Sequence, residues 1–227
     1  MRKAALHNLG CKVNSYETEA MQQMLEQAGY EIVPFEPGAD IYVINTCTVT
    51  NFGDKKSRQL IRKVKRQNEN AIVAVVGCYA QTAPKELMEI AGVNLVIGTK
   101  DRAQIVEMVE QYDRANGVEN HVSDIMKERV FEPLSIQKLA NRTRAYLKIQ
   151  DGCSQYCSYC IIPYARGPIR SREPQEVVAE VKRLAENGFK EVVLTGIHVA
   201  SYGKDRRDTS LLDILKQVHE VEGIERI

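Results

Sequence analysis

Short apolar runs alternate with amphipathic stretches along the first half of the chain. The apolar runs are β-branched or aliphatic and are bounded by Gly, Asn or Asp, which is typical of strands, and they cover residues 4–9, 41–45, 72–76 and 94–97. The stretches between them have helical spacing and cover residues 15–28, 55–67, 84–91 and 101–112. This alternation predicts an α/β fold for residues 1–112, with a doubly wound, mostly parallel sheet covered by helices on both faces.

A polar segment separates this series from a second one. Residues 113–141 are rich in Asn and Glu and have no clear period, which predicts a linker. Beyond it, strands are expected at 144–150, 191–196 and 224–227, and helices at 174–187 and 210–221. Two strand–helix units and a fragment make only the first part of a (β/α) barrel over residues 142–227. We therefore expect the chain to be the N-terminal portion of a longer protein.

The composition describes an ordinary globular protein. With 227 residues, of which 44% are hydrophobic and 27% are charged, the chain is able to bury a sizeable core. It contains no run of 18 or more apolar residues, so a membrane-spanning helix is not expected. The net charge of +1 indicates no partner by itself, and the distribution of the charges is more informative.

Cys153, Cys157 and Cys160 form a C-x3-C-x2-C pattern. Three thiolates fill three corners of a four-iron cluster and leave one iron open to a substrate or cofactor. A disulfide framework needs an oxidising compartment, and the sequence Met-Arg-Lys-Ala-Ala lacks the apolar region of a secretory signal. A structural zinc site needs a fourth ligand, and the nearest downstream histidine is His198. The spacing favours an iron–sulfur cluster over these two alternatives.

The other three cysteines, Cys11, Cys47 and Cys78, each follow the end of a predicted strand. The carboxyl ends of parallel strands share one edge of a sheet, and ligands of open α/β sheets bind there. Scattered cysteines are ordinarily unrelated buried thiols. Their placement at three consecutive strand ends instead favours a second site with three thiolates, which uses all six cysteines.

The segments that carry these cysteines resemble the methylthiotransferases, a family of radical S-adenosylmethionine (SAM) enzymes. The resemblance rests on LGCKVNSYETE at 9–19, NTCTVT at 45–50, VGCYAQ at 76–81, RAYLKIQDGC at 144–153, IPYARG at 162–167 and SR at 171–172. It covers essentially the whole chain and implies an N-terminal cluster-binding domain followed by the start of a partial radical SAM barrel. The rest of the barrel and the small C-terminal RNA-binding domain of the family lie outside this sequence.

Members of this family differ in substrate. The residues around Cys11 and Cys47 most resemble those of the bacterial branch that acts on N6-threonylcarbamoyladenosine at tRNA position 37. Two other branches act on isopentenyladenosine in tRNA and on an aspartate of a ribosomal protein, and both remain alternatives. A non-catalytic metal-binding protein that binds RNA is the alternative from another class.

The resemblance implies two 4Fe-4S clusters and SAM as cofactors. The cluster on Cys153, Cys157 and Cys160 would bind SAM at its open iron, and one electron would cleave SAM to a radical that attacks C2 of the adenosine. The cluster on Cys11, Cys47 and Cys78 would hold the sulfur-bearing group, and a second SAM would supply the methyl group. The implied partners are tRNA and an electron donor, in the cytoplasm and without a membrane.

Two further residues are candidates for contact with SAM. Tyr159 is expected beside the SAM adenine, or as an aromatic side chain that merely shields the cluster. Gly196 ends the predicted strand at 191–196, where radical SAM enzymes have a glycine-rich turn that meets the methionine part of SAM. An ordinary turn glycine is the alternative there.

Basic residues gather in three places. Seven cations fall within residues 55–66, where Leu60, Ile61 and Val64 share the helix face that is expected to pack on the sheet. The outward cations fit either a solvated helix face or contacts with RNA phosphates. The other two groups are Lys138, Arg142, Arg144 and Lys148 near the linker, and Arg166, Arg170 and Arg172 after the cysteine loop, where contact with SAM carboxylate or RNA phosphate is possible.

Overall fold

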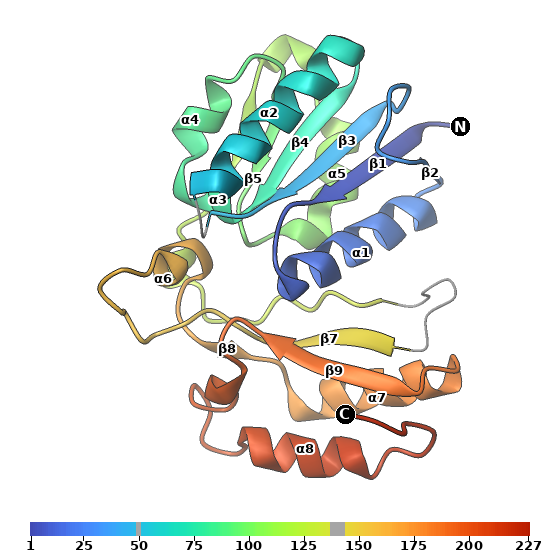
Figure 1. Ribbon diagram of the computed structural model, residues 1–227, viewed down its shortest axis with the longest axis vertical. Coiled ribbons are helices and arrows are strands. Elements are labelled where there is room, and N and C mark those ends of the chain that lie inside the picture. The colour runs from blue at the N-terminus through green and yellow to red at the C-terminus, as the bar shows by residue number, and fades with distance from the viewer. Residues whose placement is uncertain (49–50, 137–143) are drawn as a thin grey trace.

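The computed structural model of the chain describes residues 1–48, 51–136 and 144–227. It contains a six-stranded sheet and a three-stranded sheet, which lie one above the other in Figure 1. The first sheet consists of β1 (Lys3–Asn8), β2 (Glu31–Ile32), β3 (Ile41–Thr46), β4 (Ile72–Gly77), β5 (Leu95–Ile97) and β6 (Glu119–His121). Its strands are parallel throughout and follow the order β2-β1-β3-β4-β5-β6.

Helices cover both faces of this sheet (Figure 1). α1 (Lys12–Gln27) and α5 (Ile105–Gln111) pack on one face, and α2 (Asn51–Gln67), α3 (Cys78–Thr82) and α4 (Pro84–Met88) pack on the other. Successive side chains of a strand point to opposite faces, so Ile41 and Val43 pack with α1 whereas Tyr42 and Ile44 pack with α2. Burial on both faces explains the continuous apolar runs. The doubly wound, mostly parallel sheet that the sequence predicts is confirmed.

The second sheet has the order β8-β7-β9, with β7 (Arg144–Asp151), β8 (Arg170–Ser171) and β9 (Glu191–Gly196). β7 runs parallel to β9 and antiparallel to β8. α6 (Ile162–Arg166) precedes β8, and α7 (Pro174–Glu186) and α8 (Leu211–His219) pack against the second sheet. β7, α7 and β9 therefore form one strand–helix–strand unit, as expected for the first part of a barrel.

α1 lies between the two sheets and contributes to the cores of both (Figure 1). Met21 and Leu25 are buried with the strands of the first sheet, whereas Tyr16 and Ala20 are buried with β7, β9, α7 and α8. The Tyr16 hydroxyl also donates a hydrogen bond to the carbonyl of Leu134, in the segment that joins the two sheets. One helix thus buries two different faces and fixes the second sheet against the first.

The segment that the sequence assigned to a linker contains β6. This strand pairs with β5 from Leu95↔Glu119 to Ile97↔His121 and forms the edge of the first sheet. Its side chains are polar and partly exposed, so no apolar run marks it in the sequence. The boundaries at residues 112 and 142 remain predictions.

The strand predicted at residues 224–227 is reduced to a single parallel bridge between Glu191 and Arg226. Gly223, with φ of 92°, turns the chain toward β9 only at this point. The amide of Val192 donates to the carbonyl of Arg226 at 3.0 Å, and the amides of Glu225 and Arg226 donate to the carbonyl of Lys190 at 2.8 and 3.1 Å. The predicted start of a third strand is thus present as one parallel bridge beside β9.

Candidate active site at the junction of the two sheets

Cys11, Cys47 and Cys78 lie at the carboxyl edge of the first sheet. Cys47 follows β3 and Cys78 follows β4, and the residues before them, Thr46 and Gly77, are register partners. Cys11 lies beyond the end of β1 and directly precedes α1. All three are free thiols, of which Cys11 is exposed and Cys78 is buried. The three strand ends thus bring three thiols to one edge of the sheet.

Asn14 ties Cys11 to the end of β3. The Cys11 thiol donates to Oδ1 of Asn14 at 3.3 Å, and Nδ2 of Asn14 donates to the carbonyl oxygen of Thr46 at 3.0 Å. The amide group of Asn45 returns a hydrogen bond to the Asn14 carbonyl at 3.0 Å. Asn14 is buried, so these bonds replace bonds to water and hold the first turn of α1 against the strand.

The loop with Cys153, Cys157 and Cys160 starts directly after β7. Gly152 has φ of 72°, and a Cβ at this position would lie 1.8 Å from the carbonyl oxygen of Pro168, so only glycine fits. The amide of Cys160 donates to the carbonyl of Cys157 at 2.9 Å, which closes a tight turn around the last two cysteines. All three thiols are free, and Cys157 is exposed.

Of the two residues predicted to contact SAM, Tyr159 lies within this loop and Gly196 lies at the end of the neighbouring strand β9. Tyr159 is 90% exposed, so nothing in the described part of the chain buries its ring. Gly196 lies at the end of β9, where a Cβ would lie 2.7 Å from Oε1 of Gln150. The Gln150 side chain donates to the carbonyl of Gly152 at 2.6 Å and accepts the amide of His198 at 2.8 Å. Gly196 therefore permits a close contact that supports the base of the loop, and the contacts of both residues with SAM remain predictions.

Arg166 connects the two sets of cysteines. It is the last residue of α6, which follows the cysteine loop and packs against α3 (Figure 1). Its buried guanidinium donates through Nε to Sγ of Cys78 at 3.2 Å, through Nη2 to Oδ1 of Asn14 at 3.0 Å, and through Nη1 to Oε1 of Glu17 at 2.6 Å. Arg166, which follows Cys153, Cys157 and Cys160 in the sequence, thus contacts Cys78, a member of the other set.

Glu17 and Asp151 are the anionic centres of this junction. Oε1 of Glu17 lies 2.5 Å from Nη1 of Arg102, 2.6 Å from Nη1 of Arg166 and 2.8 Å from Nζ of Lys148. Oδ2 of Asp151 lies 2.5 Å from Nζ of Lys148. All five side chains are almost wholly buried, where an unpaired charge would be strongly destabilising. Because Glu17 comes from α1 and Asp151 from β7, this buried ion network joins the two sheets.

The charges of the network set the protonation of its members. Burial alone would raise the pKa of Glu17, but Arg102, Arg166 and Lys148 outweigh burial and lower it to about 2. Burial likewise opposes ionisation of Asp151, and the charge of Lys148 together with the neighbouring arginines holds its pKa well below the usual range. Both carboxyl groups are therefore ionised at neutral pH. Burial raises the pKa of the Cys78 thiol, and Arg166 acts in the opposite direction.

The described part of the chain contains no three His, Cys, Asp or Glu side chains arranged to hold a metal ion. Thiolates that hold a four-iron cluster bind separate irons, so they stand further apart than the ligands of one zinc ion. The donors present in each set, three free thiols, have the chemistry that such a cluster requires. The ligand roles of the six cysteines remain predictions.

Arg144 and Lys148, the two basic residues near the linker that the structure describes, do not form a surface cluster. Lys148 is 1% exposed and faces Glu17 across the junction, so it is unable to contact RNA phosphate. Arg144 is exposed and forms an ion pair with Glu191 at 2.7 Å. Lys138 and Arg142 lie outside the described residues.

The arginines after the cysteine loop are also internal. Arg166 and Arg170 are buried in the ion network, and Arg172 is buried against Glu180 at 3.2 Å. The sequence suggested contact with SAM carboxylate or RNA phosphate for all three. Arg166 and Arg170 pair instead with carboxylates of other elements, and Arg172 pairs with Glu180 of the helix that follows it.

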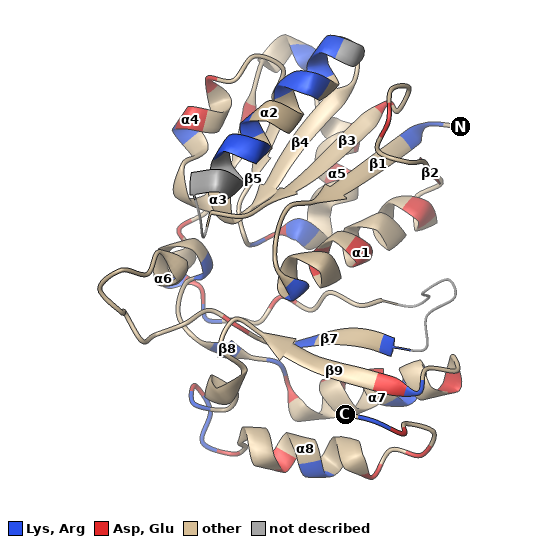
Figure 2. Ribbon diagram, viewed as in Figure 1, with Lys and Arg blue, Asp and Glu red and all other residues tan. Residues whose placement is uncertain are grey.

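α2 carries a row of outward cations, visible as blue segments along this helix in Figure 2. Ile61 and Val64 are buried against the sheet, as the sequence predicts. The exposed cations of this row are Lys55, Lys56, Arg62, Lys63 and Arg66, and the structure gives none of them an ion pair with another described residue.

No helix in the described ranges is both long and apolar enough to cross a membrane.

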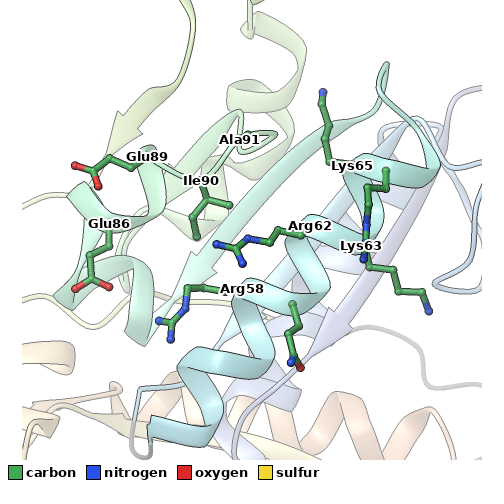
Figure 3. Close-up of a pocket in the computed structure, with 10 residues that line it drawn as sticks. Arg58, Arg62, Lys63, Lys65, Glu86, Glu89, Ile90 and Ala91 are labelled. Atoms are coloured by element: carbon green, nitrogen blue, oxygen red, sulfur yellow. The ribbon is translucent and has the colours of Figure 1, made fainter.

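A groove of about 1100 Å³ separates α2 from the chain around α4 (Figure 3). We call it the α2 groove, and its lining residues are Arg58, Gln59, Arg62, Lys63, Lys65, Arg66, Glu86, Glu89, Ile90 and Ala91. Arg58 and Arg62 point from α2 toward the opposite wall (Figure 3). Five cations and two carboxylates line the groove, so its charge favours an anionic partner.

Two family descriptions match the chain. Residues 3–98 match "Uncharacterized protein family UPF0004", and residues 147–225 match "Radical SAM superfamily". The first range contains Cys11, Cys47 and Cys78, and the second contains the C-x3-C-x2-C loop. The second half of the chain therefore carries a match to the radical SAM superfamily.

Curated relatives match over the whole chain. The chain is 52% identical over 228 residues to "Threonylcarbamoyladenosine tRNA methylthiotransferase MtaB" of Bacillus subtilis (strain 168), covering 100% of this chain and 51% of the relative. It is 36% identical over 229 residues to "tRNA-2-methylthio-N(6)-dimethylallyladenosine synthase" of Thermosipho melanesiensis, covering 100% of this chain and 52% of the relative. The chain belongs to the radical SAM methylthiotransferase family, and it spans about half the length of the curated relatives it matches.

A solved structure supports the fold. The radical SAM methyltransferase TsrM from Kitasatospora setae, with cobalamin and a [4Fe-4S] cluster bound, matches with a TM-score of 0.55. The match covers 86% of this chain and 49% of that chain at 20% identity. At this identity the likeness extends to the fold alone.

Sequence reasoning missed the roles of Asn14, Glu17, Arg102 and Asp151. Asn14 and Glu17 are three residues apart and share one face of α1, which begins at Lys12, three residues before the predicted range of 15–28. A carboxylate on a buried helix face requires a buried cation, so a partner for Glu17 was to be expected. The identity of that partner depends on tertiary contacts.

Replacing Glu17 by Gln is expected to lower the free energy of unfolding by about 3–5 kcal/mol near pH 7, because three buried cations then surround a neutral amide. The matched control is Glu225→Gln, which removes an exposed carboxylate 3.4 Å from Lys190 and should cost less than about 0.5 kcal/mol. Urea unfolding followed by circular dichroism measures both. Equal effects of the two substitutions would contradict a dominant role for Glu17.

The same residue predicts a pH dependence. Because the folded state lowers the pKa of Glu17 from 4.5 to about 2, its contribution to stability is fully present above pH 4.5 and is lost as the pH falls toward 2. The unsubstituted chain should therefore lose stability more steeply than Glu17→Gln across this window. Thermal unfolding temperatures measured between these pH values check this, and parallel curves would contradict it.

Proposed function

We propose that the chain is the cluster-bearing part of a cytoplasmic tRNA methylthiotransferase. The proposed reaction converts N6-threonylcarbamoyladenosine at tRNA position 37 into its 2-methylthio derivative. The observation that carries the proposal is the presence of two sets of three free thiols, one at the ends of parallel strands and one in the loop after β7, with Arg166 beyond that loop in contact with Cys78. The 52% identity to a threonylcarbamoyladenosine tRNA methylthiotransferase, against 36% to a dimethylallyladenosine synthase, supports this choice of substrate.

Each set of thiols suits one 4Fe-4S cluster, with three protein ligands and one open iron. When bound, the two clusters would supply reductive cleavage of SAM at the Cys153 loop and sulfur transfer at the Cys11 edge. The protein's own part is to hold the two sites at a fixed separation. Gln150 supports the base of the loop, Asn14 fixes Cys11, and Arg166 contacts Cys78. Transfer between two sites benefits from such fixed geometry.

The basic face of α2 suits a tRNA partner. Its exposed cations have no ion-pair partner among the described residues, and helix α2 begins within a few residues of Cys47 at the proposed site. Phosphate contacts position a nucleic acid without reading its sequence, so a row of lysine and arginine side chains is sufficient. The α2 groove is therefore the surface where we expect the tRNA backbone to lie.

Cluster content tests the cofactor assignment. Anaerobic reconstitution with iron and sulfide should load about eight iron atoms per chain, and a Cys153→Ala, Cys157→Ala, Cys160→Ala variant should retain about four. Colorimetric iron and acid-labile sulfide assays measure both. About four iron atoms in the unsubstituted chain, all lost in the variant, would leave Cys11, Cys47 and Cys78 as ordinary thiols.

Nucleoside analysis tests the reaction. The reconstituted full-length enzyme, with SAM and a chemical reductant in place of the electron donor, should add a methylthio group to tRNA that carries threonylcarbamoyladenosine. Mass spectrometry of the digested tRNA detects the product. Preferential modification of isopentenyladenosine or of a ribosomal protein would reassign the substrate. Failure to cleave SAM would favour a non-catalytic metal-binding protein that binds RNA.

Charge removal tests the α2 groove. Arg62→Ala with Lys63→Ala should weaken tRNA binding several-fold and reduce the salt dependence of log K by about 1 for each lost phosphate contact. The control, Lys182→Ala with Lys216→Ala, removes the same charge from exposed positions of α7 and α8. Fluorescence anisotropy at several salt concentrations measures both. Equal weakening would show that only net charge matters.

A further inference from the structure

Arg166 reaches from the radical SAM region into the N-terminal cysteine set. Its side chain is wholly buried, and its Nε donates to Sγ of Cys78 at 3.2 Å. α6 ends at Arg166 and packs against α3, whose first residue is Cys78. Cys78 is itself only 3% exposed, so this contact lies in the interior, where a hydrogen bond is electrostatically stronger than in water.

α1 fixes the direction of this contact. Nη1 of Arg166 donates to Oε1 of Glu17 at 2.6 Å, and Nη2 donates to Oε2 of Glu17 at 3.1 Å and to Oδ1 of Asn14 at 3.0 Å. A guanidinium is planar and its donors have fixed directions, so these bonds leave Nε directed at the sulfur. A lysine ammonium keeps the charge but does not reproduce this fork.

The charge of the network leaves a place for one further anion. The cations of the network are Arg102, Lys148, Arg166 and Arg170, and its carboxylates are Glu17, Glu132 and Asp151. Among these described residues the positive charges exceed the negative charges by one. A metal-bound cysteine is deprotonated, so a Cys78 thiolate would supply the missing negative charge beside Arg166.

We infer that Arg166 is a positioning residue for Cys78, through which the radical SAM region donates a hydrogen bond to one ligand sulfur of the N-terminal cluster. This inference rests on the proposed second cluster. A donor to a ligand sulfur stabilises the more negative, reduced state and raises the reduction potential. Electron uptake at the N-terminal site then depends on how the two sheets are docked.

The test uses the reconstituted chain with Cys153, Cys157 and Cys160 all replaced by Ala, so that only the N-terminal cluster remains. Arg166→Lys is introduced into this background, and the cluster is titrated with dithionite and mediators while electron paramagnetic resonance follows its reduction. We expect the midpoint to become more negative by about a tenfold change in the one-electron equilibrium, equivalent to 59 mV.

Arg102→Lys is the matched control. Arg102 binds the same Glu17 carboxylate at 2.5 Å and is equally buried, but the described contacts place it against carboxylates and not against a cysteine. Both substitutions keep the charge and disturb the network, so both should lower the unfolding temperature. Only Arg166→Lys should move the midpoint. A midpoint that is unchanged in Arg166→Lys, or that shifts equally in both variants, overturns the inference.

A measurement on the unsubstituted arginine covers the case in which Arg166→Lys fails to fold or to bind iron. With 15N-labelled arginine in the same background, pulsed electron paramagnetic resonance of the reduced cluster should detect a coupled guanidinium nitrogen, and its absence overturns the inference. If the background variant retains its iron but shows neither the midpoint shift nor the nitrogen coupling, only the role of Arg166 is refuted. Loss of all iron in the background variant refutes the second cluster and this inference together.

Discussion

The carboxylate of Glu17 is the interaction on which the junction of the two sheets depends. Arg102, Lys148 and Arg166 come from three separate parts of the chain, and each would be costly to bury without an anion. Glu17 gathers them in the second turn of α1, and Asp151 provides the second negative charge from β7. The docking of the second sheet and the orientation of the cysteine loop that follows Asp151 therefore rest on one buried charge cluster.

The elements of the fold were predictable where burial leaves a mark in the sequence. β3 and β4 are covered on both faces, so their apolar runs predict both strands to within one residue of their observed ends. β6 lies at the edge of the sheet and carries polar side chains, and only its pairing with β5 identifies it as a strand. Prediction thus failed where a strand is defined by its neighbour instead of by its own composition.

The same distinction applies to the candidate site. The cysteines were found because metal-binding thiols have short, recognisable spacings and because strand ends share an edge. The partner of Arg166 was not found, since Glu17 is 149 positions away and nothing local to either residue names the other. Lys148 was likewise predicted as a possible phosphate contact but is internal, because it pairs with Glu17, which is also distant in the sequence.

α1 serves three neighbours with three different faces. Asn14 and Glu17 face the buried ion network, Tyr16 and Ala20 pack on the second sheet, and Met21 and Leu25 pack on the first sheet. A helix turns by about 100° for each residue, so one inserted or deleted residue before Glu17 would swing every later side chain away from its neighbour. A substitution on α1 therefore changes one of these contacts, whereas a change of length before Glu17 displaces all of the later ones together.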